Sequence, residues 1–395
     1  MKDRQYYIDW IRVIAFGILI FYHSGMFFVD WGWLVRNNVA AKGFQIWMNL
    51  VNPWRLSLLF FISGVGVKFA LKSRIGVDFF GERSKKLLLP LAFGMLVVVP
   101  PQIYFERLQM HSFTGSYTAF YLQIYKFFTC NKGGLNWQHL WFVAYLWVFS
   151  VIALPFFLWL QNKSFHFFKL KNPISSFFKI LLFALPLSIT YWTLKQQWDI
   201  TNNLVSDWYN FTLSFLFFIY GYIFASQPFS WVIIEKYRKI YLTIGLSVVI
   251  LMKLYNTVFG YPIEDCMSVV LVNGFLRMLF IWCIILAICG FAKHYLNFSN
   301  KFVRYANKVV YPFYIIHQTI TVTIGFYIAD LEMSVGSKFA ILVVGTFGIT
   351  FLIYHFLIRP FRVMRLLFGM IKTNKGVEMK DFDTPLTLSP VPLRA

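Results

Sequence analysis

Residues 7–29 read YIDWIRVIAFGILIFYHSGMFFV, a hydrophobic run that contains the ionisable residues Asp9, Arg12 and His23. Crossing a bilayer takes about 20 apolar residues, so this run is long enough to span one. An ionisable group at membrane depth costs roughly 2.5 to 3.5 kcal/mol even on the gentler insertion scales. Three such groups in one span therefore predict a role beyond anchoring.

Helical geometry brings these three groups to nearly the same face, because they are separated by steps of 3 and 11 residues at about 100° per residue. At about 1.5 Å per residue, Arg12 and His23 lie roughly 16 Å apart along the axis, too far for a direct hydrogen bond. We call Asp9, Arg12 and His23 the polar stripe. Its two ends are placed to bind the two ends of one elongated ligand. The alternative is that neighbouring helices neutralise each group and that all three are structural.

The composition is that of a polytopic membrane protein, since 58% of the residues are hydrophobic and only 13% are charged, against about 25% charged in a soluble domain. The net charge of +21 is carried by basic residues clustered in short pieces between apolar segments. Membrane topology explains that clustering better than nucleic-acid binding, and no nucleic-acid partner is expected. Membrane lipid is an expected partner.

We predict an all-α fold of about ten transmembrane helices. The predicted spans are 8–29, 52–71, 87–105, 139–160, 174–194, 208–225, 240–259, 269–290, 309–329 and 338–358. Pro90 and Pro312 would fall in first turns, where proline is tolerated, whereas Pro186 would kink the fifth helix from the middle.

The distribution of Lys and Arg predicts that both termini are cytoplasmic. If the N-terminus is cytoplasmic, the loops and termini that face the cytoplasm carry 24 Lys and Arg residues, and the loops that face outward carry 6. This is the positive-inside pattern. The transmembrane domain is expected to cover residues 1–358. Residues 359–395 read as a basic and then disordered cytoplasmic tail, in which no catalytic group is expected.

The longest outer pieces and the cysteines give weaker signals. Residues 117–128 could form a helix in the membrane interface, and the aromatic and amide side chains of the outer loops could line a sugar-binding surface or simply form the interfacial belt. The spacing of the four cysteines does not suggest a metal site, and no metal is expected. Only Cys130 and Cys266 are placed where a disulfide could form, while Cys283 and Cys289 read as small apolar filler.

Familiar soluble-enzyme motifs are missing, so candidate site residues come from polar groups at membrane depth. Ser63 falls in the middle of the second span, within FFISGVG, where small-residue packing is the alternative. Arg83 and Lys86 precede the third span and are either ordinary positive-inside charges or groups that bind phosphate.

Three further positions come from later spans. His139, in WQHLWFV with Trp141, lies at the outer mouth of the fourth span, where an interfacial role is the alternative. His317 and Gln318 lie about 12 Å in from the cytoplasmic start of the ninth span and need partners. Arg277 lies deep in the eighth span, where pairing with Asp9 or with a carbonyl is the simpler interpretation.

Several stretches, in order, resemble the membrane-integral acyltransferase 3 family. They are IDWIRVIAFGILIFYHS with its Arg-x10-His spacing, FFISGVG at Ser63, ERSKKLLLP at Arg83, HLWFV at His139 and YPFYIIHQ at His317. Together they cover most of residues 5–358, and ten spans are typical of the family. The run PPQIYFERL and the His317–Gln318 pair look closest to the glucan biosynthesis protein C type, although Lys86 stands where that type often has arginine.

The resemblance implies an acyltransferase of the bacterial inner membrane that moves an acyl group, acetyl or succinyl, from cytoplasmic acyl-CoA to a hydroxyl of an extracytoplasmic glycan. Acyl-CoA would be a substrate, with no permanently bound cofactor. Residues matching Arg12 and His23 would be essential, with Asp9 beside them and the other candidates binding substrate. Neutral imidazole can take a proton from a sugar hydroxyl or attack a thioester itself, and the sequence does not choose between the two.

Two other functions compete with this one. Buried His and Arg also build proton relays, so a proton-coupled transporter is the main alternative. Transporters usually show two related halves with matching interrupted helices, and no such pairing is visible in the sequence. A non-catalytic subunit of a glycan-export complex is the third possibility, and the oligomeric state, including a homo-oligomer, stays open.

Overall fold

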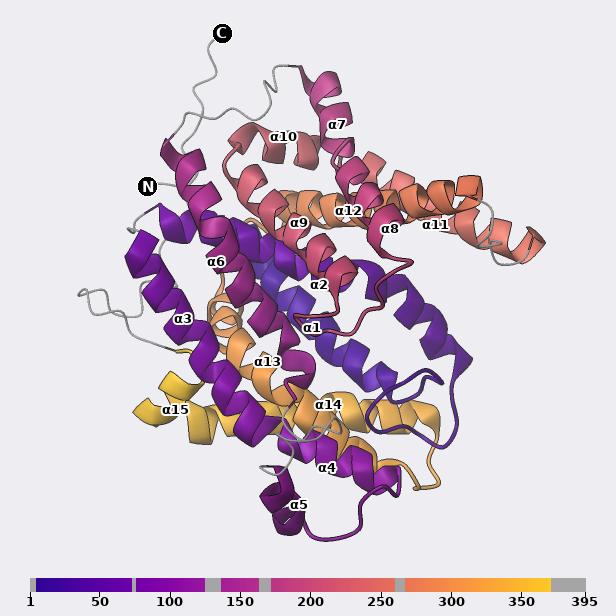
Figure 1. Ribbon diagram of the computed structural model, residues 1–395, viewed down its shortest axis with the longest axis vertical. Helices are drawn as coiled ribbons and strands as arrows, with labels where there is room; N and C mark the ends of the chain where they lie inside the picture. Colours follow the sequence, from indigo (N-terminus) through magenta and orange to yellow (C-terminus); the bar gives the residue numbers. More distant parts are fainter. Residues whose placement is uncertain (1–4, 73–75, 125–135, 163–171, 260–266, 371–395) are drawn as a thin grey trace.

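The structure is a computed structural model that describes residues 5–72, 76–124, 136–162, 172–259 and 267–370, and every regular element in these ranges is a helix (Figure 1). The α-helices are α1 (Tyr6–Met26), α2 (Lys42–Leu71), α3 (Gly76–Phe93), α4 (Pro100–Gln109), α5 (Tyr117–Ile124), α6 (Trp141–Asn162), α7 (Pro173–Leu181), α8 (Ala184–Leu194), α9 (Trp208–Ala225), α10 (Pro228–Lys236), α11 (Arg238–Phe259), α12 (Met267–Tyr295), α13 (Lys301–Ile328), α14 (Val335–Ile353) and α15 (Arg362–Leu367). Shorter turns are η1 (Gly94–Val98), η3 (Gln138–Leu140) and η4 (Tyr354–Ile358).

In the described part of the chain, nine helical segments are long and apolar enough to cross a membrane, which confirms the predicted all-α polytopic membrane fold. Each of the nine coincides with a predicted span. One of them joins α3, η1 and α4 into a single segment, Gly76–Gln109, and another joins α7 and α8. The tenth predicted span, 240–259, coincides with α11, which is helical but is not among the nine.

Several helices begin well before the spans predicted from hydropathy. α3 starts at Gly76 rather than at residue 87, and α13 starts at Lys301 rather than at residue 309. The prediction that Pro90 and Pro312 lie in first turns was therefore wrong, since both lie inside their helices. The reason is that hydropathy marks the hydrocarbon thickness, whereas a helix can continue into the polar interface on either side.

The kink predicted at Pro186 is confirmed. Helix α7 ends at Leu181 and α8 begins at Ala184, so Leu182 and Phe183 form a turn between them. Proline has no N–H, so Pro186 cannot bond the carbonyl of Leu182 four residues earlier. That carbonyl instead accepts a hydrogen bond from the Leu185 amide at 3.0 Å. The break between α7 and α8 therefore lies at the carbonyl that Pro186 cannot hydrogen-bond.

The prediction for residues 117–128 and the cysteine predictions are covered only in part. α5 occupies the first eight residues of the predicted interfacial helix, and the rest lies outside the described residues. Cys130 and Cys266 also lie outside them, so their pairing stays a prediction. Cys283 and Cys289 are buried free thiols in α12, which agrees with their interpretation as apolar filler.

Helices α2 and α9 approach each other closely through two glycines. A Cβ atom added at Gly64 would lie 1.9 Å from the Phe218 carbonyl oxygen, and one added at Gly221 would lie 1.9 Å from the Phe61 carbonyl oxygen. Two helix backbones can approach this closely only where neither carries a side chain at the contact. The FFISGVG stretch therefore fixes α2 against α9.

We expect Gly64→Ala to destabilise the protein by more than about 1–3 kcal/mol, because backbone rather than a flexible side chain occupies the space that the new methyl group needs. Gly17→Ala in α1 is the matched control, since nothing lies within 4 Å of its added Cβ. Thermal unfolding of both purified variants in detergent measures the difference. A melting temperature for Gly64→Ala equal to that of Gly17→Ala would contradict the close approach.

Helices α1, α2 and α13 run through the middle of the molecule (Figure 1). α13 lies alongside α1 in the same direction, because Arg12 bonds Asn307 near the start of both helices and His23 bonds His317 further along both. The two helices therefore bring polar residues together at two depths. Which end of the bundle faces the cytoplasm stays a prediction from the charge pattern.

The end of α14 lies at the same end of the molecule as the start of α1. Tyr305, close to Asn307 at the start of α13, packs against Phe351 and Tyr354 with ring centroids 6.5 Å and 6.2 Å away. α14 thus runs antiparallel to α13 and returns to the end where α1 begins. The start of α1 and the end of α14 therefore lie at the same end of the bundle, which the predicted location of both termini on one side of the membrane requires.

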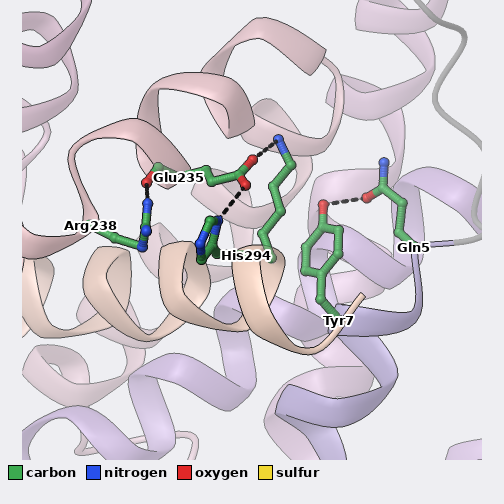
Figure 2. A network of polar contacts seen from close by, with 6 residues as sticks. Gln5, Tyr7, Glu235, Arg238 and His294 are labelled. Carbon is green, nitrogen blue, oxygen red and sulfur yellow. Dashed lines mark hydrogen bonds and ion pairs between the residues drawn. The ribbon is translucent and has the colours of Figure 1, made fainter. Parts of the chain in front are cut away.

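A polar cluster joins α10 to the end of α12 (Figure 2). Glu235 accepts hydrogen bonds from His294 at 3.2 Å and from Lys293 at 3.1 Å, and its backbone carbonyl accepts from Arg238 at 2.8 Å. Burial alone would raise the pKa of Glu235, but the bonds from His294 and Lys293 outweigh it and hold the pKa below its usual value. The contacts stabilise the helix ends and do not reach the polar stripe of α1.

Candidate active site

Three histidines from different parts of the chain meet inside the molecule: His23 of α1, His139 of η3 and His317 of α13. The ring of His23 stacks on that of His317 with centroids 5.0 Å apart, and His139 meets His317 edge-on at 5.4 Å. All three side chains are buried. We call these three residues the histidine cluster.

The hydrogen bonds of the cluster fix which nitrogen of each neutral ring carries the proton. His317 Nδ1 lies 2.7 Å from the Tyr314 carbonyl oxygen, which can only accept, so this nitrogen donates. His317 Nε2 is then an acceptor, and the 3.0 Å contact with His23 Nδ1 requires His23 to donate. It follows that the lone pair of neutral His23 is on Nε2.

His139 is held by the same helix turn that holds His317. Its Nε2 donates to the Ile315 carbonyl oxygen at 3.0 Å, and its own carbonyl accepts a short hydrogen bond from the hydroxyl of Tyr314. Its Nδ1 is buried and has no hydrogen-bond partner in the described structure. A lone pair is therefore left on this nitrogen beside the His23–His317 pair.

A second polar group surrounds Arg12 near the start of α1. Arg12 donates to the Asn307 amide oxygen at 3.0 Å and lies 3.6 Å from the carboxylate of Asp9, and Asn307 in turn donates to Asp9 at 3.1 Å. Arg83 of α3 lies within electrostatic range of Arg12 and donates to the hydroxyl of Ser150 at 3.2 Å. We call Asp9, Arg12, Arg83 and Asn307 the arginine cluster.

Four helices connect the two clusters with nearly equal spacing. Each helix carries one residue at the arginine cluster and one at the histidine cluster, and the two are ten or eleven positions apart. Named in that order, the pairs are Arg12 and His23 on α1, Gly66 and Arg55 on α2, Ser150 and His139 on α6 and the turn before it, and Asn307 and His317 on α13. At about 1.5 Å per residue the clusters lie roughly 15 to 16 Å apart. The structure thus has two polar levels in one helix bundle.

The residues at and between the two levels differ in burial. Arg12, Phe16 and Ser63 are only half-buried, whereas His23 and Tyr314 are buried. Phe16 packs edge-on against Tyr314 with centroids 5.5 Å apart. Along their helices, Phe16 lies between Arg12 and His23, and Ser63 lies between Arg55 and Gly66.

The acyltransferase 3 family model, described as an acyltransferase domain, matches residues 5–355. The chain belongs to the acyltransferase 3 family. No curated protein and no solved structure matches it. The match covers every residue of both clusters, so this protein is a membrane-integral acyltransferase of that family. In the described part of the chain, no set of three His, Cys, Asp or Glu side chains is placed to hold a metal ion.

In this acyltransferase, several predicted site residues lie where packing accounts for them. The hydroxyl of Ser63 donates to the Leu59 carbonyl oxygen of its own helix at 2.7 Å. Trp141 is buried against Tyr145 with centroids 4.9 Å apart. Gln318 donates to Gln102 of α4 at 3.1 Å and so joins α13 to α4 on a different face from His317.

Lys86 and Asp9 both lie on the side of the arginine cluster. The backbone carbonyl of Lys86 accepts a hydrogen bond from Tyr311, which lies within electrostatic range of Arg83. Asp9 is fourteen residues from His23, roughly 21 Å along α1. Its contacts are with Arg12 and Asn307, so it is placed to orient Arg12 rather than to act on His23.

Arg277 was predicted to lie deep in the eighth span, with Asp9 or a carbonyl as its simpler partner, and neither contact is found in the described structure. Its side chain is exposed on α12, within electrostatic range of Tyr209. It lies one helical turn from Asn273, which lines a cavity of about 580 Å³ between α11 and α12 that contains no residue of either cluster. Hydropathy gives the depth of a residue in a span but not which side of the helix faces lipid.

Sequence reasoning missed two polar residues of this site. Asn307 was assigned to a cytoplasmic loop because the ninth span was predicted to begin at residue 309, whereas it bonds both Arg12 and Asp9. Arg55 lies within the predicted span 52–71 but was not singled out. Its guanidinium lies 3.6 Å above the ring centre of Tyr22, the residue before His23. The sequence could have indicated Arg55, since it is a charged residue within a predicted transmembrane span.

Proposed function

We propose that this acyltransferase is an O-acyltransferase of the bacterial inner membrane that uses acyl-CoA, acetyl or succinyl, from the cytoplasm and acylates a hydroxyl of an extracytoplasmic glycan. The observation that carries the proposal is the hydrogen-bond chain from the Tyr314 carbonyl through His317 to His23, which leaves the Nε2 lone pair of His23 unused. A base or nucleophile of an acyl transfer needs such a lone pair.

In the proposed reaction, His23 Nε2 takes the proton of the acceptor hydroxyl as its oxygen attacks the thioester carbonyl carbon. A carbon–oxygen bond forms, the carbon–sulfur bond breaks, and the coenzyme A thiolate leaves with the proton returned by His23. Alternatively, Nε2 first attacks the carbonyl and forms an acyl-histidine, which the acceptor then cleaves. His317 keeps His23 in the required tautomer in both routes.

The arginine cluster is the proposed contact for the donor. Two cations, Arg12 and Arg83, lie at the end of the bundle that the charge pattern assigns to the cytoplasm. Guanidinium groups suit the phosphates of coenzyme A because they offer several donors in a planar fork. The pantetheine arm would then extend toward His23 past the half-buried side chains of Phe16 and Ser63.

The acceptor is proposed to approach over the loop that follows α1. Trp33 of this loop packs on His23 with ring centroids 5.1 Å apart. The loop is fixed by Lys338, which donates to Asn37 at 2.7 Å, and by paired hydrogen bonds of 2.8 Å between Arg36 and Gln109. Aromatic faces and amide groups suit a sugar, which presents apolar ring faces and hydroxyls.

The resemblance to the glucan biosynthesis protein C type favours a periplasmic glucan as acceptor and succinyl as the transferred group. It rests on PPQIYFERL and on the His317–Gln318 pair. In the structure, Gln102 of the first stretch bonds Gln318 and Thr319, at 3.1 Å and 2.7 Å. The two stretches of the resemblance are therefore in direct contact. Mass spectrometry of envelope glycans with and without the gene would identify acceptor and acyl group.

We expect acyl-CoA to stabilise the purified protein against heat, since a ligand that binds only the native state adds about 2.7 kcal/mol at one hundred times its dissociation constant. Arg12→Gln should weaken acyl-CoA binding roughly 10-fold to 100-fold, because a charge-assisted hydrogen bond contributes about 1.5–3 kcal/mol. Thermal shift titrations with acetyl-CoA and succinyl-CoA measure both effects.

Asp9→Asn is the matched control for this experiment. It also removes the Asp9–Arg12 ion pair but leaves the cation in place, so acyl-CoA affinity should be kept or increased. Equal weakening in both variants would show that the ion pair, and not a donor contact, is being measured. No stabilisation of the wild type by either acyl-CoA would refute the proposed donor and favour a transporter or a non-catalytic subunit.

A further inference from the structure

We propose that Arg55 of α2 forms the oxyanion site of the acyl transfer, its guanidinium donating to the thioester carbonyl oxygen as negative charge develops there. The inference rests on the proposed function. Arg55 is not part of the Arg12–His23 stripe and lies on the helix that faces it.

Arg55 lies at the histidine level of the bundle. Its guanidinium lies 3.6 Å above the ring centre of Tyr22, and its Nη2 donates to the Asn52 amide oxygen at 3.2 Å. Its charge lies within electrostatic range of both His23 and His317. At the other level, Gly66 on the same face of α2 lies against Arg12, where its added Cβ would be 3.8 Å from Arg12 Nη2.

The partners of this cation in the described structure are neutral: the side chain of Tyr22, which it stacks on and hydrogen-bonds, and the amide oxygen of Asn52. Its Nε is buried and bonds nothing. Arg12 differs in this respect, because it lies 3.6 Å from the carboxylate of Asp9. Arg55 is half-buried, with its Nε buried. A cation held at this depth without a carboxylate is well placed to receive a negatively charged group of a bound substrate.

The transfer reaction creates such a partner. When the acceptor oxygen, or His23 Nε2, attacks the carbonyl carbon, the electron pair of the C=O bond moves onto the carbonyl oxygen. A bond to carbon has then formed, and the oxygen carries the charge until the C–S bond breaks and the thiolate leaves. Donors fixed beside that oxygen in a site of low dielectric stabilise the transition state more than the ground state.

A guanidinium suits this role because its Nε–H and Nη–H groups form a rigid fork. The Nε–H of Arg55 is unused, and stacking on Tyr22 fixes the plane of the group. The geometry therefore offers a pre-oriented donor that needs no rearrangement when the charge appears. The Nδ1 of His139, which is also buried without a hydrogen-bond partner, is an acceptor and cannot donate to an oxyanion.

The test measures release of coenzyme A from acetyl-CoA and from succinyl-CoA by wild-type protein, Arg55→Gln and Arg55→Lys, with acyl-CoA affinity measured separately. Removing one oxyanion donor typically lowers kcat by about 10²–10³-fold. We expect Arg55→Gln to lose that much with both donors, with affinity changed less than about 3-fold. Arg55→Lys keeps the positive charge but not the planar set of donors, so its kcat should lie between those of the wild type and Arg55→Gln.

Lys68→Gln is the matched control, since Lys68 lies on the same helix over the ring of Tyr222, at 5.2 Å, away from the histidines. It should keep wild-type turnover. Guanidinium chloride should restore part of the rate to Arg55→Ala, which a merely structural arginine would not allow.

Wild-type turnover in Arg55→Gln, or a loss seen only as weaker acyl-CoA binding, would overturn the assignment. A loss confined to succinyl-CoA would also overturn it and would show that Arg55 binds the free carboxylate of the acyl group. If the wild type neither binds nor cleaves acyl-CoA, the proposed function falls, and this inference falls with it.

Discussion

Replacing His23 with asparagine is expected to lower acyl transfer by about 10²–10⁴-fold, the range that a positioned acid–base group supplies. The side-chain amide of asparagine occupies the position of Nδ1, so it can still donate to His317 Nε2, the 3.0 Å contact of the native ring. The variant lacks any atom at the position of Nε2. It therefore removes the proposed reactive lone pair and keeps the hydrogen bond that joins α1 to α13. Release of coenzyme A by purified protein measures the effect.

His111→Asn serves as the control for this variant. His111 is exposed just after α4 and has a φ of 52°, a conformation that asparagine adopts readily, so activity should stay unchanged. Melting temperatures of both variants should remain near that of the wild type. If His23→Asn turned over acyl-CoA at the wild-type rate, Nε2 would have no part in the reaction.

Variants of His317 should separate its two hydrogen bonds. His317→Asn can still donate to the Tyr314 carbonyl but leaves nothing to accept from His23 Nδ1, so His23 is free to take the wrong tautomer. His317→Gln can place an amide oxygen where Nε2 was and accept that bond. We expect about a 10²-fold loss of kcat for the asparagine variant, as for a misplaced catalytic group, and a smaller loss for glutamine.

The ranking of these variants is the informative result, because both remove an imidazole from the same buried position. Acyl-CoA affinity, measured by thermal shift, should be unchanged in both, since His317 lies at the level opposite the arginine cluster. Equal losses in the two variants would mean that His317 acts otherwise than by holding the tautomer of His23. A loss of affinity instead of rate would place the donor site elsewhere.

The residues of α1 were predictable because one helix sets their geometry. Arg12 and His23 share a face at any packing arrangement, and their separation follows from the helix rise alone. The same reasoning gave the polytopic all-α fold and the break at Pro186. These predictions depend on local geometry and on the thickness of the bilayer.

The partners of these residues were not predictable, because they come from other helices. Asn307 lies 295 positions from Arg12, and His317 lies 294 positions from His23. No periodicity in one segment indicates which face of α13 meets α1. For the same reason the depth of Arg277 in its span did not predict that its side chain is exposed, and Arg55, which lies against Tyr22, was overlooked.

In the proposed function, the acyl group passes from one side of the membrane to the other within this bundle. The direct measurement uses the protein in sealed vesicles with acyl-labelled acyl-CoA supplied on one side and glycan acceptor on the other. We expect labelled glycan only when acyl-CoA is on the side of Arg12 and the acceptor is on the side of Trp33. Labelling that requires donor and acceptor on the same side would show that the acyl group does not cross the membrane through this protein.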